Sequence, residues 1–264
     1  MQLMRRVQLG DQQLDELDNR IIITGVEEEA ARLNYSAVSR FGASGQRVTS
    51  MHRDTLDVTV KFALKIKKND LVARSELFEK VAGWAMEGGW LALNYRPNRR
   101  LRVVCVTLPA AGDQVAWETE YEITFRAYGV PYWQQASPVS LTVNSTKSMS
   151  RSMEIPGTAD SVLNVEFENI SGMEINTLTV GTDESSFSFK SLGLAADETL
   201  VISHTAEGLL RIRIRTAAGT TRSALAKRTE DSTDDLVVSP GAATVTLSAQ
   251  RAGKVTLSCY GRYV

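Results

Sequence analysis

The chain has 264 residues and a mass of 29.0 kDa, and its formal net charge is -1. With 43% hydrophobic residues the composition is that of a folded globular protein, and the length favours two domains of about 130 residues. The balanced charge excludes nucleic-acid binding through phosphate neutralisation alone, and no apolar run reaches the roughly 18 residues of a membrane span. No apolar segment follows Arg5 and Arg6, so we expect no signal peptide and synthesis in a cytoplasm.

The first half, residues 1–135, begins with a strongly alternating segment. Every even position from Leu56 to Ile66 is apolar, and most odd positions are polar. This period of two predicts a strand over Thr55–Ile66 with one face in a core.

A helix is predicted directly after this strand, over about residues 70–88. Asn69 or Asp70 can cap it, an apolar stripe follows at helical spacing, and Gly88-Gly89 ends it. Further strands are predicted at Trp90–Tyr95, Leu101–Leu108 and Trp117–Tyr128. The first half is therefore expected to be an α+β domain, a mostly antiparallel sheet with one packed helix.

The second half, residues 136–264, shows no helical period. It consists of short strand-like runs separated by turn residues, which predicts a β-sandwich. The polar segment Asn144–Ser152 is interpreted as a linker or an arm. The predicted strands are Pro138–Val143, Ser161–Phe167, Asn176–Val180, Ser186–Phe189, Thr199–Ser203, Leu209–Arg215, Leu236–Val238, Ala243–Ser248 and Lys254–Tyr263.

Catalytic motifs are missing from the sequence. The two histidines, His52 and His204, fall in different predicted domains, and there is no nucleophile elbow, phosphate-binding loop or Cys/His cluster. Cys105 and Cys259 lie in apolar strand-like contexts and are expected to be reduced core thiols. We therefore expect no enzymatic activity, no cofactor and no metal.

Glu118, Glu120 and Glu122 share one face of a predicted strand. A glycosidase needs two carboxylates in unlike environments, and three in a row lack that asymmetry. We interpret them as a solvated face or an interface, neutralised in part by arginines of a neighbouring strand at positions 99, 100 or 102. Catalysis by Glu118 or Glu120 stays a remote alternative.

Arg211, Arg213 and Arg215 form a positive ladder on another predicted strand. Such a ladder can bind phosphate, an anionic glycan or an acidic partner. It can also pair across the sheet with Glu166 and Glu168, which is the interpretation we favour. Both Arg211–Arg215 and the glutamate face are kept as candidate interfaces.

The strand that contains the glutamates ends in an aromatic segment at the middle of the chain. Tyr128, Pro131, Tyr132 and Trp133 lie between the two unlike halves. Bulky aromatic side chains next to a proline are typical packing anchors. We predict that these four residues pack at the junction of the two domains.

The order of these parts is similar to that of the distal tail proteins of siphophages, over nearly the whole chain. The segment Asp235–Val245 also resembles the Leu-x-x-Gly turn that this family has before its last hairpin. The other segments that carry the resemblance are the strand and helix of Thr55–Glu87, the aromatic junction of Phe125–Trp133, Ile155-Pro156-Gly157, and the terminal Arg262-Tyr263-Val264.

The resemblance implies a structural protein of the virion tail tip, made in the cytoplasm of a host bacterium. In the family, the first domain forms a homo-hexameric ring that joins the tail tube to the baseplate. The second, a galectin-like sandwich, can dock receptor-binding components. The implied partners are the tail tube, a tail-associated hub and a receptor-binding protein, with no sequence-specific nucleic acid and no membrane. The alternative is a stand-alone carbohydrate-binding protein that uses the C-terminal sandwich.

Overall fold

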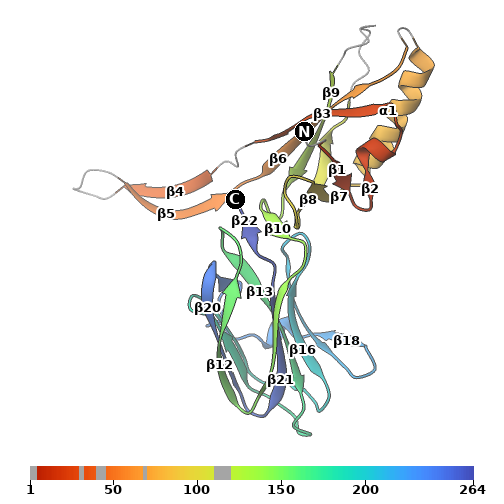
Figure 1. The fold of residues 1–264 in the computed structure, drawn as a ribbon. Helices are drawn as coiled ribbons and strands as arrows, with labels where there is room; N and C mark the ends of the chain where they lie inside the picture. The colour runs from red at the N-terminus through yellow and green to blue at the C-terminus, as the bar shows by residue number, and fades with distance from the viewer. Residues whose placement is uncertain (1–4, 30–32, 40–45, 68–69, 110–119) are drawn as a thin grey trace. The chain divides into compact units, whose positions relative to one another are not determined.

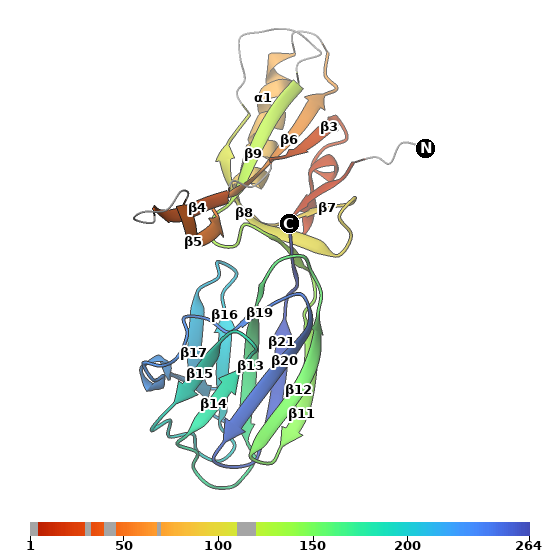
Figure 2. The same ribbon diagram turned by 90° about the vertical axis from the view of Figure 1, so that its left-hand side faces the viewer.

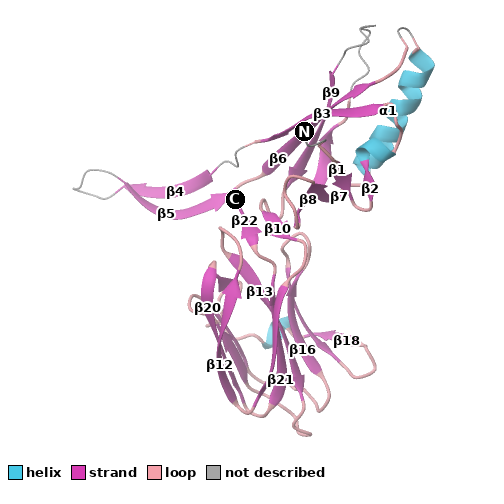
Figure 3. Cartoon of the chain, viewed as in Figure 1, coloured by secondary structure: helices cyan, strands magenta, loops and turns pink. Residues whose placement is uncertain are grey.

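The computed structural model describes residues 5–29, 33–39, 46–67, 70–109 and 120–264. The chain divides into two compact units, Met1–Trp133 and Gln134–Val264, and we describe each by itself. Figures 1 and 3 show a mostly β protein whose described residues contain a single α-helix, as predicted. No helix among them is long and apolar enough to cross a membrane.

The N-terminal unit is built on one antiparallel sheet with the strand order β2-β1-β7-β8-β9-β6-β3. The long central strands β6, β8 and β9 overlap the segments predicted from alternation. The strands of this sheet are β1 (Val7–Leu9), β2 (Gln12–Gln13), β3 (Ile21–Glu28), β6 (Leu56–Leu64), β7 (Gly89–Leu93), β8 (Arg99–Thr107) and β9 (Glu120–Ala127), and a 3-10 turn η1 spans Leu14–Glu16.

The helix α1 (Leu71–Met86) covers one face of this sheet. The Asp70 side chain caps it by accepting a hydrogen bond from the Ala73 N–H at 3.0 Å, as the sequence predicts. Phe78 and Trp84 on its buried side meet Tyr121 and Phe125 of β9 edge to face, with ring centroids 4.8 and 5.7 Å apart. The odd residues of β9 therefore face the helix, and the even residues face away from it.

A two-stranded ribbon extends from the N-terminal sheet (Figure 1). Its strands are β4 (Leu33–Ser39) and β5 (Gln46–Arg53), which pair with each other and form a separate sheet. We call this ribbon the arm. The sequence analysis did not predict it, because its side chains follow no burial pattern that would impose a clear alternation.

The C-terminal unit is a sandwich of two antiparallel sheets (Figures 1 and 2). The larger has the order β11-β21-β13-β16-β17-β18 with β19 paired to β13, and the smaller is β12-β20-β14-β15. Val165 and Phe167 of the larger sheet share one buried cluster with Val245 and Leu247 of the smaller. The core of this unit therefore lies between the sheets.

The strand bounds in the C-terminal half largely follow the predicted runs. The sequence analysis missed β12 and β18, which complete the two sheets of the sandwich, and also the short strand β10. The strands are β10 (Trp133–Gln135), β11 (Val139–Ser145), β12 (Ser148–Ile155), β13 (Ser161–Asn169), β14 (Leu178–Gly181), β15 (Ser186–Phe189), β16 (Thr199–His204), β17 (Leu210–Arg215), β18 (Thr221–Ser223), β19 (Val237–Val238), β20 (Gly241–Ala249), β21 (Gly253–Cys259) and β22 (Arg262–Tyr263), with a 3-10 turn η2 at Leu225–Lys227.

The interpretation of Asn144–Ser152 as a linker or arm is wrong. Its first residues end β11 and its last residues belong to β12, which pairs with β20 over its whole length. Met149 and Met153 are buried in the sandwich core, whereas Arg151 between them is exposed. Because this arginine occupies a position where alternation would place an apolar residue, the sequence of β12 does not show the pattern of a strand.

Candidate interface surfaces

The even residues of β9 lie on the open face of the N-terminal sheet, opposite the helix. Glu120 and Glu122 are both exposed there, because the strand alternates and Tyr121 and Ile123 point into the core. Glu118 lies outside the described residues. The predicted sharing of one strand face by Glu120 and Glu122 is therefore seen, and the role of this face as an interface stays a prediction.

The neighbour that balances this acidic face is Lys61 of β6. Its Nζ lies 2.6 Å from Glu27 Oε1 on β3 and 3.4 Å from Glu122 Oε1. The hydrogen bond to Glu27 is the largest reason why the pKa of Lys61 is raised. The partner of Glu122 is thus a lysine of β6, and not one of the arginines of β8 that the sequence analysis named. Glu120 instead accepts a hydrogen bond from Thr24 Oγ1.

Asp57 and Arg126 form a two-point ion pair on the same open face. Arg126 Nε and Nη2 donate to the two oxygens of Asp57 at 2.7 and 2.6 Å. The Asp57 carboxylate raises the pKa of the arginine, chiefly through these hydrogen bonds. The register β6–β9 places the two residues directly opposite each other, so the pair locks the alignment of these strands.

Glu28, at the end of β3, accepts hydrogen bonds from three side chains, one of which is Trp133. It accepts hydrogen bonds from Trp133 Nε1 at 2.9 Å and from Tyr95 Oη at 3.0 Å. Arg96 donates to both of its oxygens, at 3.0 and 2.8 Å, and its guanidinium lies 5.1 Å from the centre of the Trp133 ring. Trp133 is 1% exposed. The last residue of the N-terminal unit is therefore fixed to its sheet by a carboxylate.

The remaining aromatic residues of this segment are held less tightly. Arg53, at the base of the arm, donates to Pro131 O at 3.4 Å and lies 4.9 Å from the centre of the Tyr132 ring. Pro131 is buried and Tyr128 is exposed. These contacts all lie inside the N-terminal unit. Packing of the four residues between two domains stays a prediction.

The arginine ladder on β17 is exposed on the outer face of the larger sheet, while Ile212 and Ile214 point into the core. Arg215 Nη2 reaches across β16 to Glu166 Oε2 at 3.0 Å. Glu168 lies near Lys254, at 3.9 Å. The predicted pairing thus occurs for Arg215 and Glu166 only.

Arg211 and Arg213 make no ion pair with any described residue of the chain. Their neighbours across the sheet are Ser203 and Val201, and Ser223 lies beside Arg213 on the edge strand β18. These two guanidinium groups are the uncompensated positive charge of this face. The role of the ladder as an interface stays a prediction.

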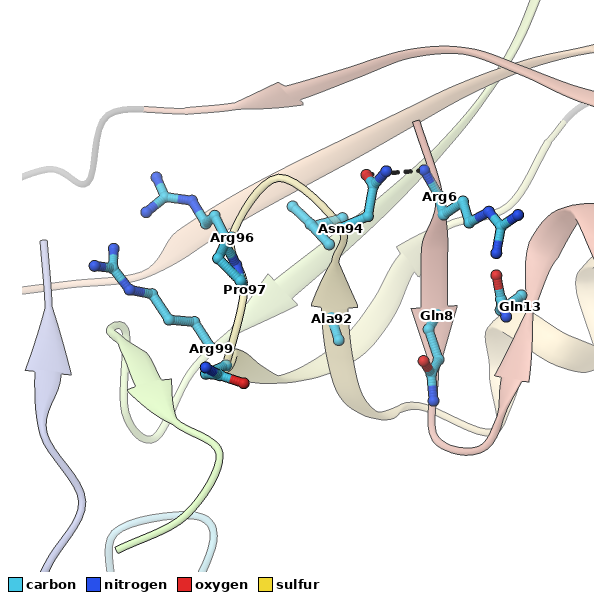
Figure 4. A pocket seen from close by; sticks show the side chains of 10 residues that line it. Arg6, Gln8, Gln13, Ala92, Asn94, Arg96, Pro97 and Arg99 are labelled. Carbon is cyan, nitrogen blue, oxygen red and sulfur yellow. Dashed lines mark hydrogen bonds between the residues drawn. The ribbon is translucent and has the colours of Figure 1, made fainter. Parts of the chain in front are cut away.

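An open pocket lies at the β1–β2–β7 edge of the N-terminal sheet (Figure 4). Asn94 Oδ1 accepts a hydrogen bond from the Arg6 N–H at 3.0 Å and closes one wall. Figure 4 shows the side chains of Arg96 and Arg99 on one side of the β7–β8 turn and that of Arg6 on the other. Because these cations diverge, the pocket does not form a focused anion site.

Some residues of these surfaces were missed by the sequence analysis. Glu28 lies within the run Glu27-Glu28-Glu29, which by itself predicts only a charged surface. Lys61 was assigned to the polar face of its strand, but its partners come from two other strands. No group of three or more His, Cys, Asp or Glu that could hold a metal ion occurs in the described parts of the chain.

Comparisons with known proteins show likeness in structure and not in sequence. No protein-family model matches the chain, and no curated protein matches it in sequence. One solved structure that matches is the Dit protein of phage SPP1, which is described as a paradigm of the hub adsorption apparatus in phages that infect Gram-positive bacteria. The match covers 98% of this chain and 99% of the SPP1 Dit chain, with a TM-score of 0.65 and 11% sequence identity.

Two structures of the phage P2 baseplate in its activated conformation, with Ca and with Sr, also match, at TM-scores of 0.48 and 0.47 and 6% identity. They cover 98% and 97% of both chains, and they carry no argument at this score. The predicted resemblance is confirmed at the level of structure: over almost its full length, the chain has the fold of the SPP1 Dit protein.

Proposed function

We propose that this chain is a structural protein of a phage or prophage tail tip. The observation that carries the proposal is the match to SPP1 Dit over almost the full length of both chains, so that both units of this chain take part in it. A match that covers a single common domain would be weaker, since common folds serve many functions.

The proposed role is a homo-hexameric ring that joins the tail tube to the baseplate, built by the N-terminal unit. The C-terminal sandwich, which we propose to be galectin-like, would dock receptor-binding components. The described surfaces suit assembly, because both units present exposed strand faces on which some of the charges are paired within the chain. We propose no chemical reaction, because Glu120 and Glu122 on β9 are both exposed and neither lies in the apolar pocket that raises the pKa of a general acid.

Light scattering and negative-stain images of the purified full-length chain test this proposal. We expect particles of six times 29.0 kDa with six-fold symmetry. A monomeric chain whose C-terminal unit binds cell-wall polysaccharide in a calorimetric titration would contradict it. That outcome would favour the alternative function, a stand-alone carbohydrate-binding protein.

The two candidate faces can be tested in the same assay. Replacing Glu120 and Glu122 by Ala removes the acidic strand face, and replacing Arg211 and Arg213 by Ala removes the uncompensated arginines. If the particle mass does not change, the face in question is not part of the ring contact. The glutamate face is expected to act in the ring and the arginine face in docking another tail protein.

A further inference from the structure

Two arginines on the outer face of β17 lie beside uncharged residues on the neighbouring strands. Arg211 lies opposite Ser203 of β16. Arg213 lies between Val201 of β16 and Ser223 of β18. The strand register therefore places no carboxylate directly beside either arginine.

The third arginine of this strand is already paired within the chain. Arg215 Nη2 lies 3.0 Å from Glu166 Oε2 on β13. An external carboxylate that binds Arg215 has to compete with Glu166, and the loss of that pair offsets part of the new contact. The arginines that a ligand can bind without this competition are Arg211 and Arg213.

The polar groups around these two arginines suit a ligand that accepts hydrogen bonds. A guanidinium group has five N–H donors and no acceptor. Ser223 Oγ accepts a hydrogen bond from the Leu225 N–H at 3.5 Å, which leaves its own hydroxyl proton for another acceptor. Oxygen atoms that carry negative charge, as in a carboxylate or a phosphate, match this set of donors.

Two exposed leucines flank the arginines and favour a protein ligand over a chain of phosphates. Leu209, two positions before Arg211, is 66% exposed, while Leu210 between them packs against the core. Leu225, whose N–H contacts Ser223, is 49% exposed. A protein segment has apolar side chains that remove such leucines from water, whereas a phosphate chain has none.

These observations together define one docking surface, which we call the β17 face and which consists of Arg211, Arg213, Leu209 and Leu225. We propose that the β17 face docks an extended acidic segment of another tail protein. Alternate side chains of a strand are about 6.6–6.8 Å apart, and an extended partner segment presents its own alternate side chains at the same spacing. The partner segment therefore has carboxylates at two alternate positions and an apolar residue two positions further along. The inference rests on the proposed docking role of the C-terminal unit and names the chemistry of its partner.

Fluorescence anisotropy of the full-length chain with a labelled peptide tests the β17 face. The probe is the peptide Thr-Leu-Thr-Glu-Thr-Glu-Thr, and its neutral counterpart has Gln in place of both Glu. We expect the acidic peptide to bind with a Kd below about 1 mM and the neutral peptide to bind at least about tenfold more weakly.

A charge-matched pair of variants separates this face from general attraction by positive charge. Arg211→Gln with Arg213→Gln is expected to raise the Kd of the acidic peptide by about tenfold or more. The control, Lys147→Gln with Lys190→Gln, removes the same charge from exposed residues of the same unit outside the β17 face. We expect the control to change the Kd by less than about twofold. An equal loss in both variants would mean that the peptide binds through overall charge, and the inference would be wrong.

The leucines distinguish a protein segment from a polyanion. Leu209→Ser with Leu225→Ser is expected to raise the Kd of the acidic peptide by about threefold or more, because the apolar contact is lost. If this variant binds the peptide as the wild type does, the leucines are not part of the site. If long-chain polyphosphate binds through Arg211 and Arg213 while the peptide does not bind, the face takes a polyanion and the inference is overturned.

The peptide assay does not require a ring, so its failure is distinct from failure of the proposed ring. Equal binding of the acidic and neutral peptides, or no binding up to about 1 mM peptide, overturns the inference and leaves the ring proposal standing. A sample that binds the acidic peptide as expected but stays monomeric in light scattering contradicts the ring and supports the β17 face.

Discussion

Replacing Glu28 by Ala is expected to destabilise the N-terminal unit strongly. The change removes the carboxylate that accepts four hydrogen bonds. One comes from Tyr95 Oη, one from Trp133 Nε1, and two from Arg96, through its Nε and Nη2. The Trp133 N–H then stays buried without its acceptor, since this residue is 1% exposed. Arg96 keeps partial access to water, which recovers some of the loss. We expect a net cost of roughly 2–4 kcal/mol.

The neighbouring change Glu27→Ala is the matched control. Glu27 also forms an ion pair, with Lys61 at 2.6 Å, but its side chain is 64% exposed. Exposed pairs contribute about 0–1 kcal/mol, so this variant is expected to behave almost as the wild type. The two changes remove the same chemical group from adjacent residues of one strand and differ in burial and number of partners.

Urea denaturation followed by tryptophan fluorescence measures the difference. All four tryptophans lie in residues 1–133, so this signal reports the N-terminal unit even if the two units unfold separately. A loss of about 3 kcal/mol corresponds to a midpoint shift of roughly 1–2 M urea. Equal midpoints for Glu28→Ala and Glu27→Ala would refute the role assigned to the carboxylate at Trp133.

Three further changes have expected effects on stability. Gly83→Ala should stabilise the N-terminal unit by about 0.5–1 kcal/mol in the same fluorescence assay, because Gly83 is exposed inside α1 with open space around a new Cβ. Gly261→Ala should destabilise the C-terminal unit by about 2 kcal/mol or more in denaturation followed by circular dichroism, since its Cβ would lie 2.2 Å from Pro156 O; an unchanged midpoint would contradict this close approach. Arg222, whose hydrogen bonds to Glu198 are 2.5 and 2.7 Å long, holds the pKa of that carboxyl below its ordinary value of 4.5. The pair therefore stabilises the fold above that value and loses this contribution as the pH falls through the folded pKa. Glu198→Gln should cost about 1–2 kcal/mol near pH 7, and this cost should shrink as the pH falls below 4.5; a cost that does not change with pH would contradict the pair.

Strands with one buried face could be predicted from the sequence. The alternation from Leu56 to Leu64 exists because each even residue enters the core under α1, and burial imposes a period of two on the residue types. The helix was equally visible, through Asp70 at its start and the apolar residues that pack on β9. In these elements the pattern of residue types follows directly from which side chains are buried.

Elements whose side chains do not follow burial could not be predicted. The arm leaves only a short periodic signal, the alternation from Leu33 to Ala37, because nearly every side chain of β4 is exposed. The ion-pair partners of the charged side chains could not be predicted from the sequence either, because they depend on the order of the strands in the sheet. Lys61 reaches Glu122 only because β6 lies between β3 and β9, an arrangement of strands that are far apart in the chain.

The ion pairs change which charges can give these surfaces their specificity. A charged side chain that is already paired within the chain can bind a partner only if its ion pair is broken or desolvated. The free energy of that step offsets much of what the new contact would contribute. Glu122 shares Lys61 with Glu27, and Arg215 is paired with Glu166. Within these two ladders, the charges without an ionic partner among the described residues are Glu120 on β9 and Arg211 and Arg213 on β17. Recognition by charge should therefore depend on these three residues more than on their neighbours in the same ladders.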